Sequence, residues 1–177
     1  MVRPEVPAPH GGKRRGAGRK KSGGGRPNVA HGVRGLHKPR FPVHVTLRLA
    51  RGLPSLSTQR VREMFRSVVL DQRKRRYADT FQVVEFSIQA DHVHLIVEAK
   101  GDDAPRGLRA GVMGGEVAFA KRLNMMLGRR GNVWTDRWHG RELTSPTDVG
   151  NALVYVLRNS AKHGMRFKGR DVVDIMS

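Results

Sequence analysis

The chain has 177 residues, and its 34 Lys and Arg residues against 15 Asp and Glu residues give a formal net charge of +19. This length suits one domain with a hydrophobic core, while the absence of cysteine excludes disulfides, thiolate metal sites and a cysteine nucleophile. The sequence contains no run of about 18 apolar residues, so no membrane span is predicted. The basic N-terminus lacks the apolar stretch of a secretory signal. Such a positive field attracts polyanions, so we expect a nucleic-acid partner and a cytoplasmic, nucleoid-associated location.

Residues 1–40 differ in composition from the rest of the chain. They contain eleven Lys and Arg residues, one acidic residue (Glu5) and many Gly and Pro residues. Such a segment cannot bury enough apolar surface to offset the entropy lost on ordering. We therefore predict a disordered basic arm that lies along phosphates, with a solubilising tail as the alternative. Its expected DNA contacts are Lys13, Arg14, Arg15, Arg19, Lys20 and Lys21.

The first predicted elements are a strand and a helix. Residues 42–49 alternate apolar and polar side chains, which is typical of a half-buried strand. A helix is predicted from about Thr58 to Arg76, because apolar residues recur there at spacings of three and four. Its inward face comprises Val61, Met64, Phe65, Val68 and Val69, and its basic end, with Arg73, Arg75 and Arg76, is expected to face DNA.

Two strands and a second helix follow. Residues 81–88 and 92–98 are predicted to form a hairpin through the short connection at 89–91. A helix is expected over 105–127, although its glycines, including Gly111, weaken it by about 1 kcal/mol each relative to alanine. The residues predicted to face inward are Met113, Val117, Ala120, Leu123 and Leu127.

The last part of the chain contains a short extended segment, around 133–134 and 141–143, and a well-marked helix. Ser145 can cap that helix, Pro146 suits its first position, and Gly164 is placed to end it before a tail at 165–177. The predicted apolar face comprises Val149, Ala152, Leu153, Val156 and Leu157. The order of elements predicts an α+β, ferredoxin-like (RRM-like) sandwich with a central antiparallel sheet.

His92 and His94 are the first candidate site residues. Side chains alternate along a strand, so the two imidazoles share one face, about 7 Å apart by the rise per residue. Two imidazoles so placed can hold one divalent cation. The alternative is a pair of unrelated histidines on a half-exposed strand.

The last helix carries a second polar pattern. Asn151, Tyr155 and Asn159 are spaced by four and form one stripe beside the apolar face. Tyr155 can therefore be held on one side and present its hydroxyl to a cleft, or it can simply pack at the edge of the core. Tyr77, the other tyrosine, follows a basic run, where stacking on a base or simple packing is expected.

Taken together, these motifs resemble the tyrosine transposases of the IS200-like type, including the group associated with repetitive extragenic palindromes (REP). The resemblance covers roughly residues 41–164. His92-Val93-His94 resembles the His-hydrophobe-His motif of this family, and the segment from Tyr155 to Gly164 resembles its tyrosine helix. Trp134-Thr-Asp-Arg-Trp138 resembles the aromatic and basic stretch between them. Ser160 stands where palindrome-associated members usually carry proline.

The resemblance implies a metal-dependent enzyme that nicks and rejoins single-stranded DNA through a 5′-phosphotyrosine intermediate. It implies Tyr155 as the nucleophile and Mg²⁺ or Mn²⁺ held by His92, His94 and Asn159. The implied partners are hairpin or repeat ends of single-stranded DNA, bound by a monomer or a homodimer. Two alternatives stay open: a non-catalytic nucleic-acid-binding module of the same fold, and a domesticated relative that processes chromosomal repeats.

Other side chains between and around these motifs receive secondary interpretations. Trp134 and Trp138 can stack on bases or fill the core, and Arg137 and Arg141 can bind phosphates. Three residues near the motifs are given no direct role: His44 is expected to be structural, His139 solvated, and Glu85 a surface carboxylate or a partner of the histidine pair.

Overall fold

The computed structural model describes residues 35–72, 74 and 76–162. The predicted contacts of the basic arm from Lys13 to Lys21, two basic residues of the first helix end (Arg73 and Arg75), and the segment from Gly164 to the end of the chain lie outside the described residues.

Seven elements make up the described part of the chain. They are β1 (Val43–Arg48), α1 (Gln59–Gln72), β2 (Phe81–Ile88), β3 (His92–Ala99), α2 (Ala104–Met126), β4 (His139–Glu142) and α3 (Pro146–Lys162). The strands form one antiparallel sheet in the order β2-β3-β1-β4. The first six elements follow the β-α-β-β-α-β order of a ferredoxin-like fold, which confirms the predicted fold class.

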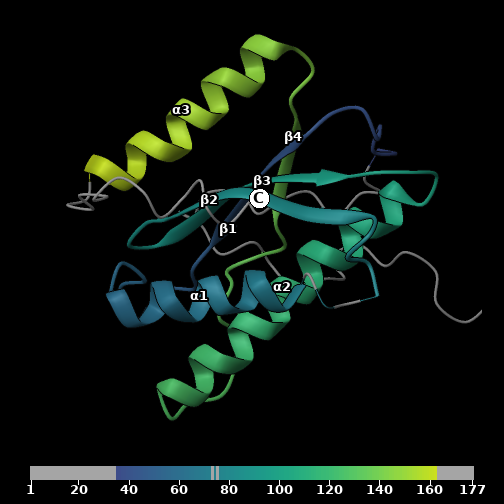
Figure 1. Ribbon diagram of the computed structural model, residues 1–177. Helices are drawn as coiled ribbons and strands as arrows, with labels where there is room; N and C mark the ends of the chain where they lie inside the picture. The colour runs from purple at the N-terminus through teal and green to yellow at the C-terminus, as the bar shows by residue number, and fades with distance from the viewer. Residues whose placement is uncertain (1–34, 73, 75, 163–177) are drawn as a thin grey trace, which may run out of the picture.

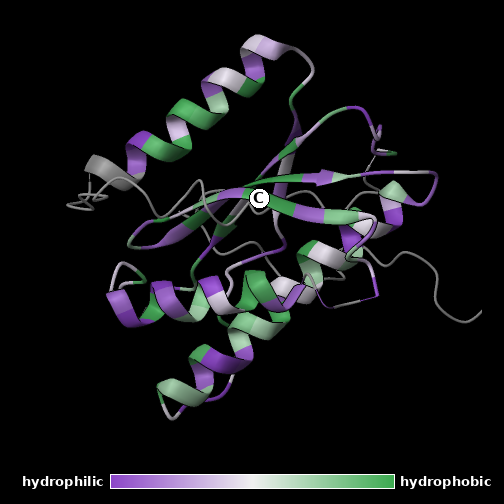
Figure 2. Ribbon diagram, in the orientation of Figure 1, coloured by the Kyte–Doolittle hydropathy of each residue, from purple (hydrophilic) through white to green (hydrophobic). Residues whose placement is uncertain are grey.

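The sheet lies between two layers of helices (Figure 1). Helices α1 and α2 pack together beneath one face, and α3 crosses the opposite face over β2 and β3. Side chains alternate between the two faces of the sheet along each strand. On β1, Val43, Val45 and Leu47 belong to the core shared with α1 and α2. Figure 2 shows the corresponding mixture of hydrophobic and hydrophilic residues along strands and helices.

Helix α3 is held by a small second core and by its N-terminal cap. Ala152 and Val156 are buried against Ile96 of β3 and Leu143. The backbone N–H of Asp148 donates to the Ser145 hydroxyl oxygen at 3.1 Å, as the cap prediction requires. The cap and the second core together fix which side of α3 faces the sheet.

Two features of the helices differ from the sequence prediction. Helix α1 ends at Gln72 rather than near Arg76. On α2, Met113 and Val117 are 50% and 51% exposed instead of facing inward, and on α3 Leu157 is 45% exposed. The face of α2 that packs against the sheet contains glycine instead. At Gly111 a Cβ would lie only 2.2 Å from Cδ1 of Phe81.

Within the described ranges, no helix has both the length and the apolar character needed to cross a membrane.

Candidate active site

The polar side chains of the sheet gather on the face that α3 covers. In the register between β1 and β3, Thr46 lies opposite His94 and Arg48 lies opposite His92. In the register between β1 and β4, Thr46 lies opposite His139. Because side chains on one face of neighbouring strands are adjacent, three neighbouring strands contribute histidines to this face of the sheet.

His92 and His94 lie side by side, as the alternation of the strand predicts, with ring centroids 4.7 Å apart. Nδ1 of His92 lies 2.6 Å from Oδ1 of Asp91. An ionised carboxylate only accepts, so the Nδ1–H of His92 donates to Asp91, and this contact does not involve Nε2. Hydrogen bonding to His92 is the main cause that holds the pKa of the Asp91 carboxyl below its usual range.

His94 is the buried member of the pair, with 5% of its surface exposed. Its Nδ1 lies 3.2 Å from Nε2 of His44 and 3.2 Å from the Thr46 hydroxyl oxygen. Burial, followed by the nearby His92, His44 and Arg48, lowers the pKa of His94 to about 3. His94 is therefore a neutral imidazole at physiological pH, which is the form that binds cations.

Tyr155 reaches the same place from α3. Its hydroxyl oxygen lies 3.4 Å from Nε2 of His94, and the two ring centroids are 5.1 Å apart. When His94 carries its proton on Nδ1, that N–H donates toward His44 or Thr46, and Nε2 accepts from the Tyr155 hydroxyl. Tyr155 is 48% exposed, so its phenol is accessible to a substrate from solvent.

The donor set suits a divalent cation. Two neutral imidazoles are good ligands for such an ion, and a carboxylate on the far nitrogen, as Asp91 provides for His92, is the usual support of a ligating histidine. No group of three or more His, Cys, Asp or Glu side chains that could hold a metal occurs in the part of the chain described. A third ligand from these described residues would therefore be of another type. Asn159 is half-buried on α3, one turn beyond Tyr155.

His44 was expected to be structural, but it lies against the candidate site. Its ring centroid is 5.1 Å from that of His94 and 6.0 Å from that of Tyr155. Burial and the positive groups of Arg141 and His139 lower its pKa. The signal that could have found it is the alternation in residues 42–49, which places His44 and Thr46 together on the polar face of the strand.

The structure places both tryptophans in packing roles, the alternative that the sequence left open. Trp138 is only 6% exposed. Trp134 stacks on Phe119 with centroids 5.4 Å apart, and its Nε1–H donates to the Glu116 carbonyl at 3.1 Å. Trp138 is therefore buried, and Phe119 covers one face of the half-buried Trp134 indole.

The remaining predicted residues lie outside β3 and α3. Arg141 is exposed on β4, 3.7 Å from the Asp148 carboxylate near the start of α3. Arg137 is half-buried, and Arg76 is exposed beyond the end of α1. The Glu85 carboxylate accepts from the backbone N–H of Phe86 at 2.8 Å, and burial raises its pKa.

Comparisons with known proteins bear on the fold. No protein-family model and no curated protein matches this chain. Among solved structures, a REP-associated tyrosine transposase bound to a REP hairpin is similar over 77% of this chain and 75% of its own, with 19% identity and a TM-score of 0.55. A putative transposase from Deinococcus radiodurans aligns over 72% of this chain and 97% of its own, with 15% identity and a TM-score of 0.47. The chain is thus similar in fold to a REP-associated tyrosine transposase, as its motifs led us to expect.

Proposed function

We propose that this protein is a transposase-type enzyme that nicks and rejoins single-stranded DNA with Tyr155 as its nucleophile. The observation that carries the proposal is the 3.4 Å approach of the Tyr155 hydroxyl to Nε2 of His94, at the side of a second imidazole. A half-exposed phenol next to two cation-binding groups is the arrangement that phosphodiester cleavage by tyrosine needs. The net charge of +19 supplies attraction for the DNA strand.

The reaction we propose conserves the energy of the phosphodiester bond. The Tyr155 oxygen attacks phosphorus, the bond from phosphorus to the 3′ oxygen breaks, and the strand leaves with a 3′-hydroxyl. The downstream strand stays attached to Tyr155 through its 5′ phosphate, and attack by a 3′-hydroxyl reverses the step for joining. The second core, which contains Ala152 and Val156, keeps α3 and therefore Tyr155 in place beside His94 during both steps.

His92 and His94 would hold Mg²⁺ or Mn²⁺, and we propose Asn159 as a third ligand. When bound there, the ion supplies Lewis-acid stabilisation of the negative charge on the scissile phosphate. Asp91 orients His92, and Thr46 and His44 occupy the far nitrogen of His94. The chain's own part is thus to keep His94 neutral by burial and to orient both imidazoles.

End-labelled single-stranded oligonucleotides test this function. With Mg²⁺ or Mn²⁺ present, a label at the 3′ end is expected to migrate with denatured protein, whereas a 5′ label is released on a shorter strand. Both signals are expected to disappear with a chelator or with His92→Ala plus His94→Ala. An adduct that carries the 5′ label, or one that forms equally well without the metal, would contradict the proposed chemistry.

A further inference from the structure

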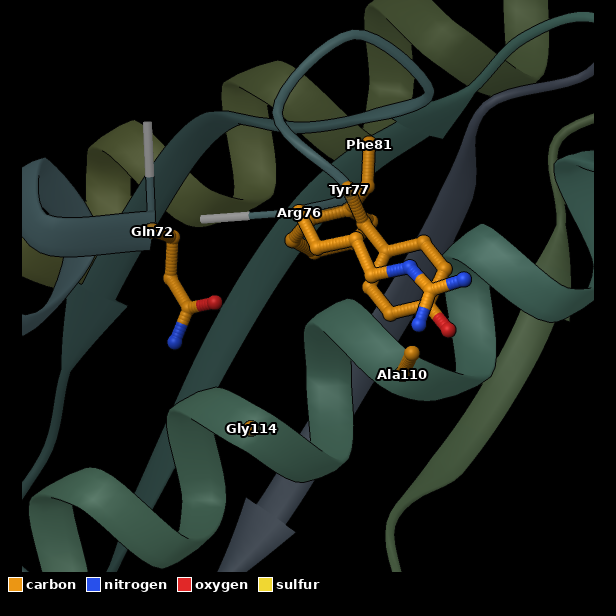
Figure 3. A pocket seen from close by; sticks show the side chains of 6 residues that line it. All are labelled: Gln72, Arg76, Tyr77, Phe81, Ala110 and Gly114. Atoms are coloured by element: carbon orange, nitrogen blue, oxygen red, sulfur yellow. The ribbon is translucent and has the colours of Figure 1, made fainter. Parts of the chain in front are cut away.

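A cavity of about 360 Å³ lies on the opposite side of the sheet from Tyr155, between the end of α1 and helix α2. It is lined by Gln72, Arg76, Tyr77, Phe81, Ala110 and Gly114 (Figure 3). Its volume is within the range of about 300–1,000 Å³ that is usual for small-ligand sites. None of these residues belongs to the cluster around His94.

The Gln72 side chain brings a buried hydrogen-bond donor without a partner to this cavity. Gln72 is only 8% exposed, and its Nε2 is buried without a hydrogen-bond partner in the described part of the chain. A buried amide N–H that donates to nothing costs stability, so such groups are rare unless a ligand uses them. The amide points down toward α2 in Figure 3, where the ideal Cβ position of Gly115 lies 3.7 Å from Nε2.

The other walls combine aromatic rings with one positive charge. Tyr77 and Phe81 supply two aromatic rings, and Arg76 is exposed at the rim with its guanidinium carbon 6.0 Å from the centre of the Tyr77 ring. No acidic residue is among the described residues that line the cavity. Aromatic rings stack with planar bases, the amide needs an acceptor, and an arginine binds phosphate.

We infer that this cavity holds one unpaired nucleobase of a single-stranded nucleic acid, stacked on Tyr77, with Gln72 donating to an acceptor on the base edge and Arg76 facing the backbone phosphate. Every natural base offers an edge acceptor, so the site would accept bases of different identity. The sheet separates the cavity from Tyr155, so the base held here is not the nucleotide at the point of cleavage. This inference rests on the single-strand binding of the proposed function but not on its chemistry.

The test uses the full chain carrying Tyr155→Phe, which retains the cavity and removes the proposed nucleophile. Fluorescence anisotropy compares a thymidine strand with an abasic strand of equal length, since both carry the same phosphates. The protein is expected to prefer the thymidine strand. Ala110→Leu, which fills the cavity from α2, is expected to reduce that preference at least about five-fold, as is Tyr77→Ala, whereas Tyr77→Phe retains it.

Two further variants keep the result interpretable if Tyr77→Ala unfolds. Gln72→Met removes the unsatisfied amide at similar size, so it is expected to retain or raise the melting temperature while lowering the base preference. Val117→Leu changes an exposed residue of α2 outside the cavity and is expected to alter neither the melting temperature nor the base preference. Equal binding of thymidine and abasic strands by the parent, or an unchanged preference in folded Ala110→Leu and Gln72→Met, would overturn the inference.

Photo-crosslinking locates the base directly. A strand that contains 5-iodouridine is expected to crosslink to a peptide that includes Tyr77 or Phe81, and Ala110→Leu is expected to abolish that product. Crosslinks confined to other peptides would contradict the assignment. If no covalent adduct forms with the unmodified chain but these results hold, the proposed cleavage is wrong and the nucleobase site stands.

Discussion

The hydroxyl oxygen of Tyr155 lies 3.4 Å from Nε2 of His94, although 61 positions of sequence separate the two residues. The sheet fixes His94 through its pairing with β1, and the cap and small core of α3 fix Tyr155. The candidate site therefore depends on the packing of α3 against the sheet. Variants can test the contribution of individual residues to this site.

The support that Asp91 gives to His92 can be measured as cation affinity. Removing a carboxylate behind a ligating histidine typically weakens metal binding about 10–100-fold. The Asp91 side chain is 80% exposed, so water can replace part of this effect. We expect Asp91→Ala to weaken Mn²⁺ binding about ten-fold by isothermal titration calorimetry. Glu98→Gln on the same strand is the control, and an equal loss in both variants would contradict the specific role of Asp91.

The depressed pKa of His94 predicts a dependence of stability on pH. Its folded pKa, about 3, lies below the ordinary histidine value of 6.5, so between these values the unfolded chain binds a proton that the folded chain does not. The free energy of unfolding is therefore expected to decrease as pH falls from 7, by about 2 kcal/mol at pH 5. The lowered pKa of His44 acts in the same direction.

Urea unfolding between pH 5 and 7 measures this effect. His94→Gln removes the titrating group, so the decrease toward pH 5 is expected to become shallower than in the unmodified chain. A decrease of the same size in His94→Gln would show that burial of His94 is not its cause.

Two glycines of α2 provide a matched pair for the packing of this helix. A Cβ at Gly111 would meet the Phe81 ring at 2.2 Å, whereas a Cβ at Gly115 meets nothing closer than 3.7 Å. We expect Gly111→Ala to lower the free energy of unfolding by about 1–3 kcal/mol, and Gly115→Ala to raise it by up to about 1 kcal/mol. Chemical denaturation distinguishes them, and equal effects would show that Phe81 does not set the distance to α2.

The error over α2 in the sequence prediction has the same physical origin. Hydrophobic periodicity is a signal of side chains, and the closest approach of α2 to the sheet occurs at Gly111, which has none. Met113 and Val117 supplied the apparent stripe and are exposed. By contrast, strand β1 alternates clearly, so its position could be predicted. The common face of His92 and His94 follows from their spacing of two residues on β3.

Those parts of the site that lie on one strand could be predicted from the sequence. Those that depend on the pairing of distant strands could not. His92 and His94 share a strand, and their common face follows from alternation alone. The contact of His44 with His94 depends on the register of β1 against β3, which no local pattern reports. The packing of Trp134 on Phe119 likewise joins distant segments.

The predicted basic arm can be tested through salt dependence. Residues 1–34 contain nine Lys and Arg residues, and contacts with single-stranded phosphates each contribute about 0.7 to the slope of log affinity against log salt. Changing the six basic residues between Lys13 and Lys21 to Gln is therefore expected to flatten the slope by up to about 4. A slope equal to that of the unmodified chain would show that these side chains do not bind phosphate.

The role of Tyr155 is tested most directly by which tyrosine forms the covalent adduct. The chain has two tyrosines, Tyr77 and Tyr155, so each Phe variant is the control for the other. With single-stranded DNA and Mg²⁺ or Mn²⁺, we expect Tyr77→Phe to form a denaturation-resistant adduct and Tyr155→Phe to form none. An adduct of undiminished yield with Tyr155→Phe would contradict the assignment of Tyr155 as the nucleophile.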